Sequence, residues 1–227
     1  ATLLNSRANP TAGWYLGRGL AGSVGPRGLT NDTTNYQILG GFRGTVGISD
    51  WTYDVYGSHG KTTSIGEYEG FADLARYQQL ISAPNYGAGY SLTIPNRGTF
   101  ATCTSGLNPF VTTPISADCF SIINAPITTT TELEQDVVEA TVQGKAYDLP
   151  AGELRFAVGG DYRSDRFSYR PDPDMAQSNI TGATIGIFGA NAAAGETKVY
   201  EGYGEVVAPI VKDLPFAQLI EANLGYR

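Results

Sequence analysis

The sequence has no long apolar run and a deficit of basic residues, and each absence bears on the class of protein. No stretch of the 227 residues approaches the roughly 18 consecutive apolar residues that a membrane-spanning helix needs, which excludes a helical membrane protein. The 22 acidic residues outnumber the 15 Lys and Arg residues, and the formal net charge is −7. This balance argues against a nucleic-acid partner, because phosphate binding requires a positive surface.

Potential metal ligands and catalytic groups are scarce as well. The chain has one histidine, His59, and two cysteines, Cys103 and Cys119, which together are too few for a four-ligand zinc site. Asp172 and Asp174 alternate with Pro171 and Pro173 and lack the ligand number of a calcium site. No motif places a nucleophile or an acid beside His59. We therefore expect no metal, no cofactor and no enzymatic activity.

The two cysteines lie 16 positions apart in a segment rich in Thr, Ser, Pro and Asn. We expect a Cys103–Cys119 disulfide formed in an oxidising compartment, which would stabilise the loop by about 3 kcal/mol in the chain-entropy model. Two unpaired buried thiols remain the alternative.

The composition favours β structure, with 29 Gly, 14 Tyr and 9 Phe. Apolar and polar residues alternate over long stretches, as where Val138 and Val142 alternate with Glu139 and Thr141. This period of two predicts hairpins over 35–63, 132–169 and 196–227, separated by loops over 1–34, 64–131 and 170–195. Within the longest loop, the spacing of apolar residues over 71–83, followed by Pro84, predicts one short helix.

The connections between these strands alternate in length. The joins at 48–50, 149–152 and 212–215 are short, whereas those at the opposite ends are long, as in transmembrane β-barrels. Aromatic residues near the strand ends agree with the aromatic girdles of such barrels: Trp51, Tyr53, Tyr147 and Phe216. We predict an all-β fold: a curved antiparallel meander of about six strands, part of a large transmembrane β-barrel, with long extracellular loops and one short helix.

Several segments also resemble a known family, in their order and spacing as well as their residues. The most specific is the Asp148–Gly152 turn with the Val158–Arg163 strand, and the Cys103 to Cys119 loop with Leu107–Phe110 is similar too. The others are Gly41–Gly44, Trp51–Val55, Thr131–Gln135 and Glu201–Glu205. Together they resemble the barrel of TonB-dependent outer-membrane receptors.

This resemblance implies energy-coupled uptake of a scarce nutrient, such as a siderophore, vitamin or saccharide, across the outer membrane of a Gram-negative bacterium. The implied partners are outer-membrane lipid, the imported small molecule and the inner-membrane TonB complex. In that family the TonB complex binds through a plug domain, and no plug sequence is visible in this chain. Six strands are also fewer than the eight of the smallest barrels, so we expect an interior piece of the barrel of such a receptor.

Two sets of residues are candidates for contact with the transported molecule. The first consists of charges expected to face the lumen, although wall residues that only pair across strands would look the same: Arg43, Asp54, Arg155, Arg163, Glu201 and Glu205. The second consists of loop aromatics, which are common binding anchors but which also pack loops against themselves: Trp14, Tyr86, Tyr90 and Phe110.

A second hypothesis is a secreted soluble β-sandwich that binds glycans through its aromatic loops, and an enzyme on such a scaffold is the least supported. The position of the apolar residues separates a sandwich from a barrel. In a sandwich Phe156, Val158, Val206 and Ile220 must meet across a core, whereas in a barrel they point outward to lipid.

Overall fold

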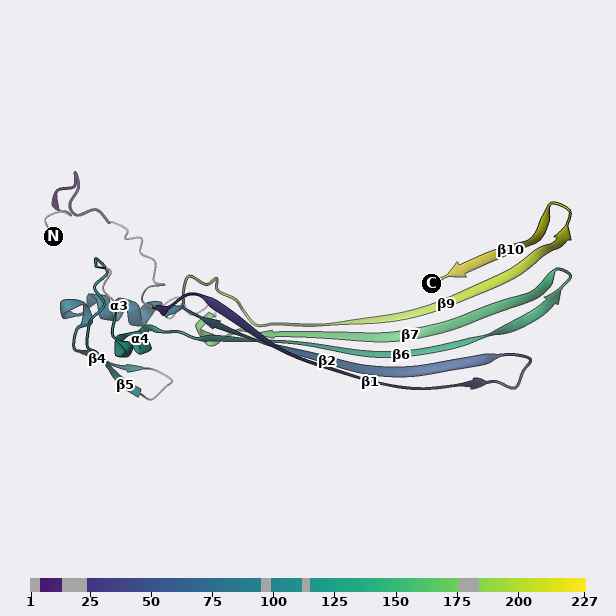
Figure 1. The fold of residues 1–227 in the computed structure, drawn as a ribbon, viewed down its shortest axis with the longest axis horizontal. Coiled ribbons are helices and arrows are strands. Elements are labelled where there is room, and N and C mark those ends of the chain that lie inside the picture. Colours follow the sequence, from purple (N-terminus) through teal and green to yellow (C-terminus); the bar gives the residue numbers. More distant parts are fainter. Residues whose placement is uncertain (1–4, 14–23, 95–98, 112–114, 176–183) are drawn as a thin grey trace. The chain divides into compact units, whose positions relative to one another are not determined.

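A computed structural model describes residues 5–13, 24–94, 99–111, 115–175 and 184–227 (Figure 1). The chain divides into two compact units, each built from segments far apart in the sequence. We call the first the sheet unit; it comprises Thr30–Gly66, Thr128–Asp172 and Asn191–Arg227. We call the second the loop unit; it comprises Ala1–Leu29, Glu67–Ile127 and Pro173–Ala190.

The sheet unit is built on a six-stranded antiparallel sheet, which confirms the predicted meander (Figure 1). Its strands follow one another in the order β1-β2-β6-β7-β9-β10. Their bounds are β1 Gly28–Thr45, β2 Thr52–Glu69, β6 Ile127–Leu149, β7 Gly152–Arg170, β9 Ala193–Leu214 and β10 Ala217–Tyr226. The described strands do not close into a barrel, and β1 and β10 are the two edges.

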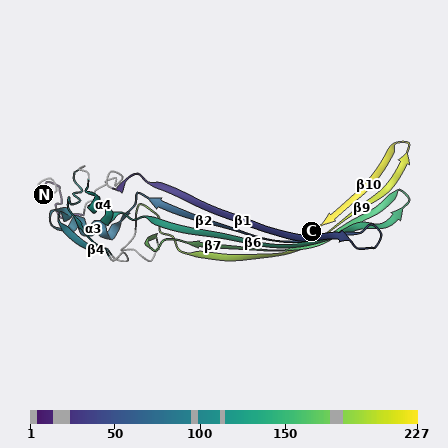
Figure 2. The ribbon, with the colours of Figure 1, turned by 60° about the horizontal axis from the view of Figure 1, so that its bottom comes forward.

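The strands are longer than the sequence indicates. β1 begins at Gly28 and β6 at Ile127, so the expected loops over 1–34 and 64–131 end too late by several residues. The expectation was wrong there because Gly, Asn and Thr obscure the apolar–polar alternation in these segments. Such residues still form strands, because the hydrogen bonds between strands involve the backbone and not the side chains. The register of β6 on β7 shifts once, between Lys145 and Tyr147, and that of β10 on β9 once, between Ile220 and Glu221. Figure 2 shows the sheet bending along the length of its strands.

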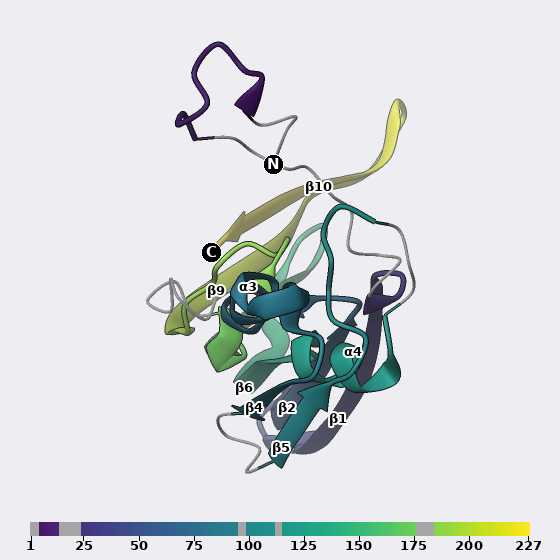
Figure 3. The ribbon, with the colours of Figure 1, turned by 90° about the vertical axis from the view of Figure 1, so that its left-hand side faces the viewer.

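Among its described residues, the loop unit contains the helices α3 and α4, the strands β4 and β5 (Figure 3), and a small sheet of β3 and β8. The helix α3 spans Leu74–Ser82, and α4 spans Ala117–Ile123. One sheet pairs β3 (Ala72–Asp73) with β8 (Thr184–Ile185), and the other pairs β4 (Tyr90–Ile94) with β5 (Thr99–Cys103). Short 3₁₀ turns lie at Pro84–Gly87 and Pro173–Met175. No helix among the described residues is long and apolar enough to cross a membrane.

The α3 helix lies inside the predicted range, and its ends follow from local chemistry. The Asp73 carboxylate accepts a hydrogen bond from the Arg76 backbone N–H at 2.8 Å, which satisfies a free donor of the first turn. Pro84 follows the C-cap residue Ala83 and cannot continue the helix. The second helix, α4, was missed by the expectation of one helix, because at seven residues it is too short for helical periodicity to be evident.

A small core and a disulfide hold the loop unit together. Leu80 of α3 and Ile122 and Ile123 of α4 are fully buried in one cluster with both cysteines. Cys103 and Cys119 form the predicted disulfide, which joins β5 to α4. A second cluster packs Phe71 with residues from two distant segments, Ile127 and Met175. The long loops of the sequence therefore fold into a unit with its own interior.

Candidate functional site

The two faces of the sheet differ in chemistry, and the strand register assigns each residue to a face. The ladder pairs Glu139 with Asp161 and Asp161 with Glu201, and residues opposite each other share a face. We call this the polar face. The neighbouring row pairs Val138 with Tyr162, and Tyr162 with Tyr200, on what we call the apolar face.

All six lumen-facing candidates lie on the polar face. Arg43 of β1 and Asp54 of β2 line an open groove with Glu139 and Gln143 of β6. The other four alternate with apolar-face residues along β7 and β9: Arg155, Arg163, Glu201 and Glu205. Two of them form ion pairs with close neighbours on the same face. Arg163 contacts Asp165 at 3.2 Å, and Glu201 is bonded to Arg227 of the chain end. The alternation in the sequence thus placed these six charges on one face. Which of them are neighbours across strands follows only from the strand register.

A hydrogen-bonded cluster occupies the middle of the polar face. The Glu139 carboxylate accepts bonds from the hydroxyls of Tyr56, at 2.6 Å, and Tyr203, at 2.8 Å. The Tyr203 hydroxyl also lies 2.5 Å from the Thr141 hydroxyl. These contacts connect β2, β6 and β9. Because β7 lies between β6 and β9, the bonds from Tyr203 cross a strand, which backbone hydrogen bonds between adjacent strands cannot do. The end of the Tyr203 ring lies over Gly159 of β7, where an added Cβ would be 2.5 Å from its Cζ and hydroxyl oxygen.

The β1–β2 turn is locked onto β6 at the position where the register shifts. The Asp50 carboxylate accepts a hydrogen bond from the Lys145 backbone N–H at 2.7 Å, and the Trp51 indole N–H donates to the Lys145 carbonyl at 2.7 Å. The Lys145 bond and the Arg155 guanidinium, 2.8 Å away, hold the pKa of Asp50 below its usual range. The Trp51 ring lies over Gly144 and packs edge-on against Phe156, with ring centroids 4.8 Å apart.

The apolar face is exposed over much of its length. Val158 and Val138 in the middle of the sheet are 51% and 52% accessible, and Tyr200 is 75% accessible. Val206 and Ile220, which the sandwich hypothesis requires to be buried, are also exposed. The sheet unit has no second layer among its described elements that covers this face.

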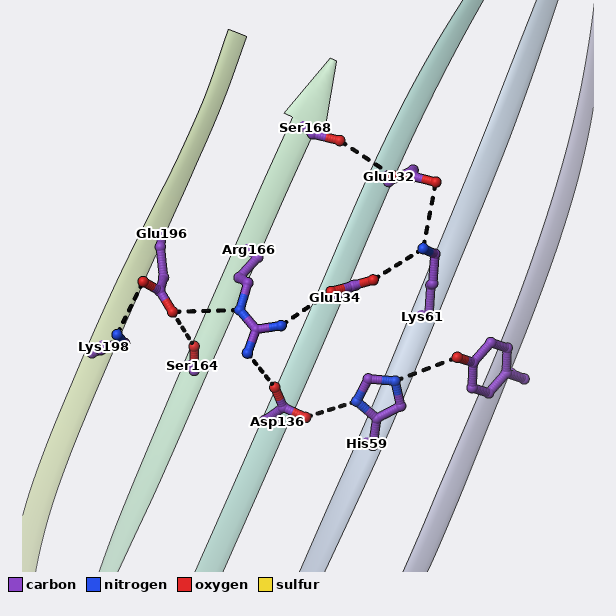
Figure 4. A network of polar contacts seen from close by, with 11 residues as sticks. His59, Lys61, Glu132, Glu134, Asp136, Ser164, Arg166, Ser168, Glu196 and Lys198 are labelled. Carbon is purple, nitrogen blue, oxygen red and sulfur yellow. Dashed lines mark hydrogen bonds and ion pairs between the residues drawn. The ribbon is translucent and has the colours of Figure 1, made fainter. Parts of the chain in front are cut away.

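One end of the apolar face carries a charged network that the sequence analysis did not predict (Figure 4). We call it the collar. It begins directly beyond the row of Val138, Tyr162 and Tyr200, on the strand ends away from the short turns. Its members come from β2, β6, β7 and β9: His59, Lys61, Glu132, Glu134, Asp136, Ser164, Arg166, Ser168, Glu196 and Lys198.

Arg166 is the centre of the collar. Its guanidinium contacts Glu134 at 3.1 Å, Asp136 at 3.0 Å and Glu196 at 3.4 Å, so it joins β7 to both neighbouring strands. Lys61 pairs with Glu134 at 3.0 Å and with Glu132 at 3.4 Å.

The collar extends to β1 through its histidine. The His59 Nδ1 atom lies 2.7 Å from the Asp136 carboxylate, and its Nε2 atom lies 3.4 Å from the Tyr36 hydroxyl of β1. On β9, Lys198 pairs with Glu196 at 3.0 Å. The network therefore links the sheet strands β1, β2, β6, β7 and β9, and each of its charges has a partner of opposite sign.

A sequence signal for the collar exists. Continuing the apolar-face alternation from Val138 back toward the start of β6 reaches Asp136, Glu134 and Glu132. The apolar face therefore turns charged at a definite row. The sequence of a single strand does not specify its register against its neighbours. The pairing of these acids with Lys61 of β2 and Arg166 of β7 therefore became evident only from the structure.

Of the four loop aromatics, the structure brings two together. Tyr86 and Phe110 meet with ring centroids 6.1 Å apart, at an angle typical of edge-to-face packing. Tyr86 and its neighbour Asn85 both have positive φ, a conformation uncommon for residues other than glycine. Tyr90 lies on β4 and is 39% accessible, and Trp14 falls outside the described residues.

The described residues contain no group of three or more His, Cys, Asp or Glu side chains placed to hold a metal ion. Comparison of the chain with protein-family models, with curated proteins and with solved structures finds no match.

Proposed function

We propose that this chain is part of the barrel wall of a TonB-dependent receptor in the outer membrane of a Gram-negative bacterium. Its parent imports a scarce nutrient such as a siderophore, vitamin or saccharide, and receives energy from the inner-membrane TonB complex. The observation that carries the proposal is the single-layer sheet whose exposed apolar face lies opposite a charged and hydrogen-bonded face. The family assignment rests on the sequence resemblance.

The apolar face favours hydrocarbon as its environment. Each buried aliphatic side chain is worth about 1.5–3 kcal/mol relative to an exposed one, and soluble monomers rarely leave contiguous apolar patches of this extent in water. A bilayer satisfies these side chains without a second protein layer. The inner strands β2, β6, β7 and β9 pair their backbone polar groups with a neighbour on each side, and in the proposed barrel the open edges of β1 and β10 pair with further strands, as a membrane requires.

The polar face fits the wall of a watery lumen. The row of Glu139, Asp161 and Glu201 and the groove beside Arg43 and Asp54 would be costly against lipid, but they are well placed against water, a solute or a plug domain. Most of these charges act as wetted wall residues that pair across strands, and selectivity is tuned from that side.

The rival β-sandwich receives less support. It requires Phe156, Val158, Val206 and Ile220 to pack across a core, and in the sheet unit these residues share one largely exposed face. The edge-to-face pair of Tyr86 and Phe110 remains compatible with ligand contact in either hypothesis.

Site-directed spin labelling of the full-length parent in outer-membrane vesicles tests the membrane assignment. Labels at Val142, Gln143, Ala157 and Val158 sample both faces of the same strand pair. We expect labels at the two valines to collide mainly with oxygen, which partitions into lipid, and labels at the other two to collide with a water-soluble nickel chelate. Protection of the valine positions from both reagents would refute the proposal, because it would indicate a protein core.

Import is tested separately with a strain that lacks the parent gene. Uptake of labelled iron chelates, cobalamin and oligosaccharides is compared with that of the complemented strain, with and without a proton-motive-force uncoupler. We expect one solute class to depend on the gene and on the energised inner membrane. Gene-dependent uptake that persists after uncoupling would contradict energy coupling.

A further inference from the structure

We infer that an open groove on the polar face, near the strand ends that the long connections join, binds a neutral saccharide. The inference rests on the proposed function and deepens it, because it selects one of the solute classes that the parent could import. Its basis is a pair of exposed apolar side chains on the face assigned to water, together with the neutral polar groups around them.

The apolar pair consists of Leu133 of β6 and Phe167 of β7, which lie directly opposite each other. The two side chains are 51% and 41% accessible. They alternate with Glu134 and Arg166 of the collar, so they lie on the polar face of the sheet. In the proposed function lipid covers the other face and cannot cover this pair. Its exposure therefore points to a ligand or a protein segment that packs on it from the lumen.

A hollow adjoins the pair because one neighbour has no side chain. Gly195 of β9 lies opposite Phe167 in the same row, and a Cβ added to it would meet no atom within 4 Å. The groove has a volume of about 840 Å³ and extends over β1, β2, β6, β7 and β9. This volume lies within the range of about 300–1,000 Å³ that is typical of ligand pockets. The hollow is therefore large enough for a small molecule.

The polar groups that line the groove beside the pair are mainly amides and hydroxyls. Asn35 and Gln37 of β1 flank Tyr36, whose hydroxyl reaches the collar, so both amides lie on the polar face. Thr197 of β9 lies opposite Asp165 in the row next to the apolar pair. Among the described residues, no hydrogen bond engages the side chains of Asn35, Gln37 or Thr197. Their donors and acceptors can therefore bond to a ligand.

The charges at the groove are already balanced. The Asp165 carboxylate accepts a hydrogen bond from the Gln135 amide at 2.8 Å and pairs with the Arg163 guanidinium at 3.2 Å. Lys61 and Arg166 are directed to the opposite face, where they pair with carboxylates of the collar. An anionic ferric chelate or a phosphorylated solute would find no unpaired cation here, whereas a neutral solute fits.

A saccharide ring has the matching chemistry. Its C–H groups form an apolar surface that packs on an aromatic ring such as that of Phe167, because the face of the ring carries partial negative charge. Its hydroxyl groups both donate and accept hydrogen bonds, as the amides of Asn35 and Gln37 do. Long connections are extracellular in transmembrane β-barrels, so the groove lies on the side from which an imported sugar arrives.

Isothermal titration calorimetry of the purified full-length parent tests the groove, with maltohexaose, xylohexaose, cellohexaose and chitohexaose as probes. We expect at least one of the four sugars to bind. Phe167→Ala should weaken that binding about tenfold or more, because the aromatic surface is lost. Phe167→Trp retains an aromatic ring and should preserve binding, whereas Phe167→Leu, which is apolar but has no ring, should not.

Filling the hollow provides an independent variant. Gly195→Gln places a side chain next to Phe167 and should also weaken sugar binding about tenfold or more, with an unchanged midpoint of guanidinium unfolding, because its Cβ meets no atom. Ala157→Gln is the matched control. Ala157 lies on the same face of β7, ten residues or about 33 Å before Phe167, and its replacement should leave binding unchanged.

The outcomes separate this inference from the proposed function. Failure of all four sugars to bind, or binding unaffected by Phe167→Ala and Gly195→Gln, would overturn the saccharide groove. A Phe167→Ala variant that unfolds at lower guanidinium concentration but binds sugar normally would assign the groove to a plug domain or another protein segment. Energy-coupled uptake of a ferric chelate or cobalamin without sugar binding would overturn the groove and leave the proposed function intact. Sugar binding without gene-dependent uptake would refute import alone.

Discussion

Replacement of Val158 by arginine places a charge in the middle of the apolar face. Val158 lies four residues from Tyr162 and four from Leu154, or about 13 Å from each along the strand. At this depth a lipid-facing arginine costs about 2–4 kcal/mol, falling to about 0–1 kcal/mol near the interface. Because the valine is already 51% accessible, the same change on a water-facing surface would cost about 0.5 kcal/mol or less.

The assay is guanidinium unfolding of the full-length parent in phospholipid vesicles, followed by circular dichroism. Gln143→Arg, on the polar face, is the matched control and should change the free energy of unfolding by about 0.5 kcal/mol or less. Val158→Leu separates lipid from a protein core, because lipid tolerates the extra methylene whereas overpacking a core costs about 1–3 kcal/mol. A tolerated arginine, or a destabilising leucine, would refute the assignment of this face to lipid.

Three further changes test other parts of the molecule. Changing Cys103 and Cys119 to serine together should destabilise the loop unit by about 3 kcal/mol, seen as faster proteolysis between these positions on intact cells; unchanged cleavage would contradict a stabilising disulfide. Hydrogen bonds from nearby hydroxyls lower the pKa of Asp118 to about 2, so its stabilisation is present above about pH 4 and is lost as the pH falls through about 2. Asp118→Asn should remove this acid dependence of thermal unfolding, and an unaltered profile would assign it to other groups. Gly159→Ala should cost about 1–3 kcal/mol, because its Cβ would overlap the Tyr203 ring, whereas the Cβ of Gly202→Ala would meet only the Gly159 carbonyl at 4.0 Å and should be nearly neutral; equal effects in guanidinium unfolding would contradict the close approach.

The sequence was sufficient to assign residues to the two faces of the sheet. It was insufficient to identify the side-chain contacts that connect neighbouring strands. A period of two assigns every residue of a strand to a face, so Arg43 and Glu201 were correctly grouped before any pairing was known. The partners of Arg166 depend on the register of three strands, and no local pattern encodes that register. The sequence also located the α3 helix through its proline stop, whereas α4 is held by burial of Ile122 and the disulfide, which are long-range interactions.

The attachment of the β1–β2 turn to β6 has a consequence for assembly of the sheet. Asp50 and Trp51 bond to the main chain of Lys145, which is far away in the sequence, and these contacts satisfy groups at an irregular point of the ladder. A hairpin that docked one residue out of step would lose both bonds and move the indole away from Gly144, where an added Cβ would come within 2.6 Å of the ring. The turn therefore favours one register between the β1–β2 hairpin and the β6–β7 hairpin. These hairpins are separated in the sequence by the long segment that forms much of the loop unit.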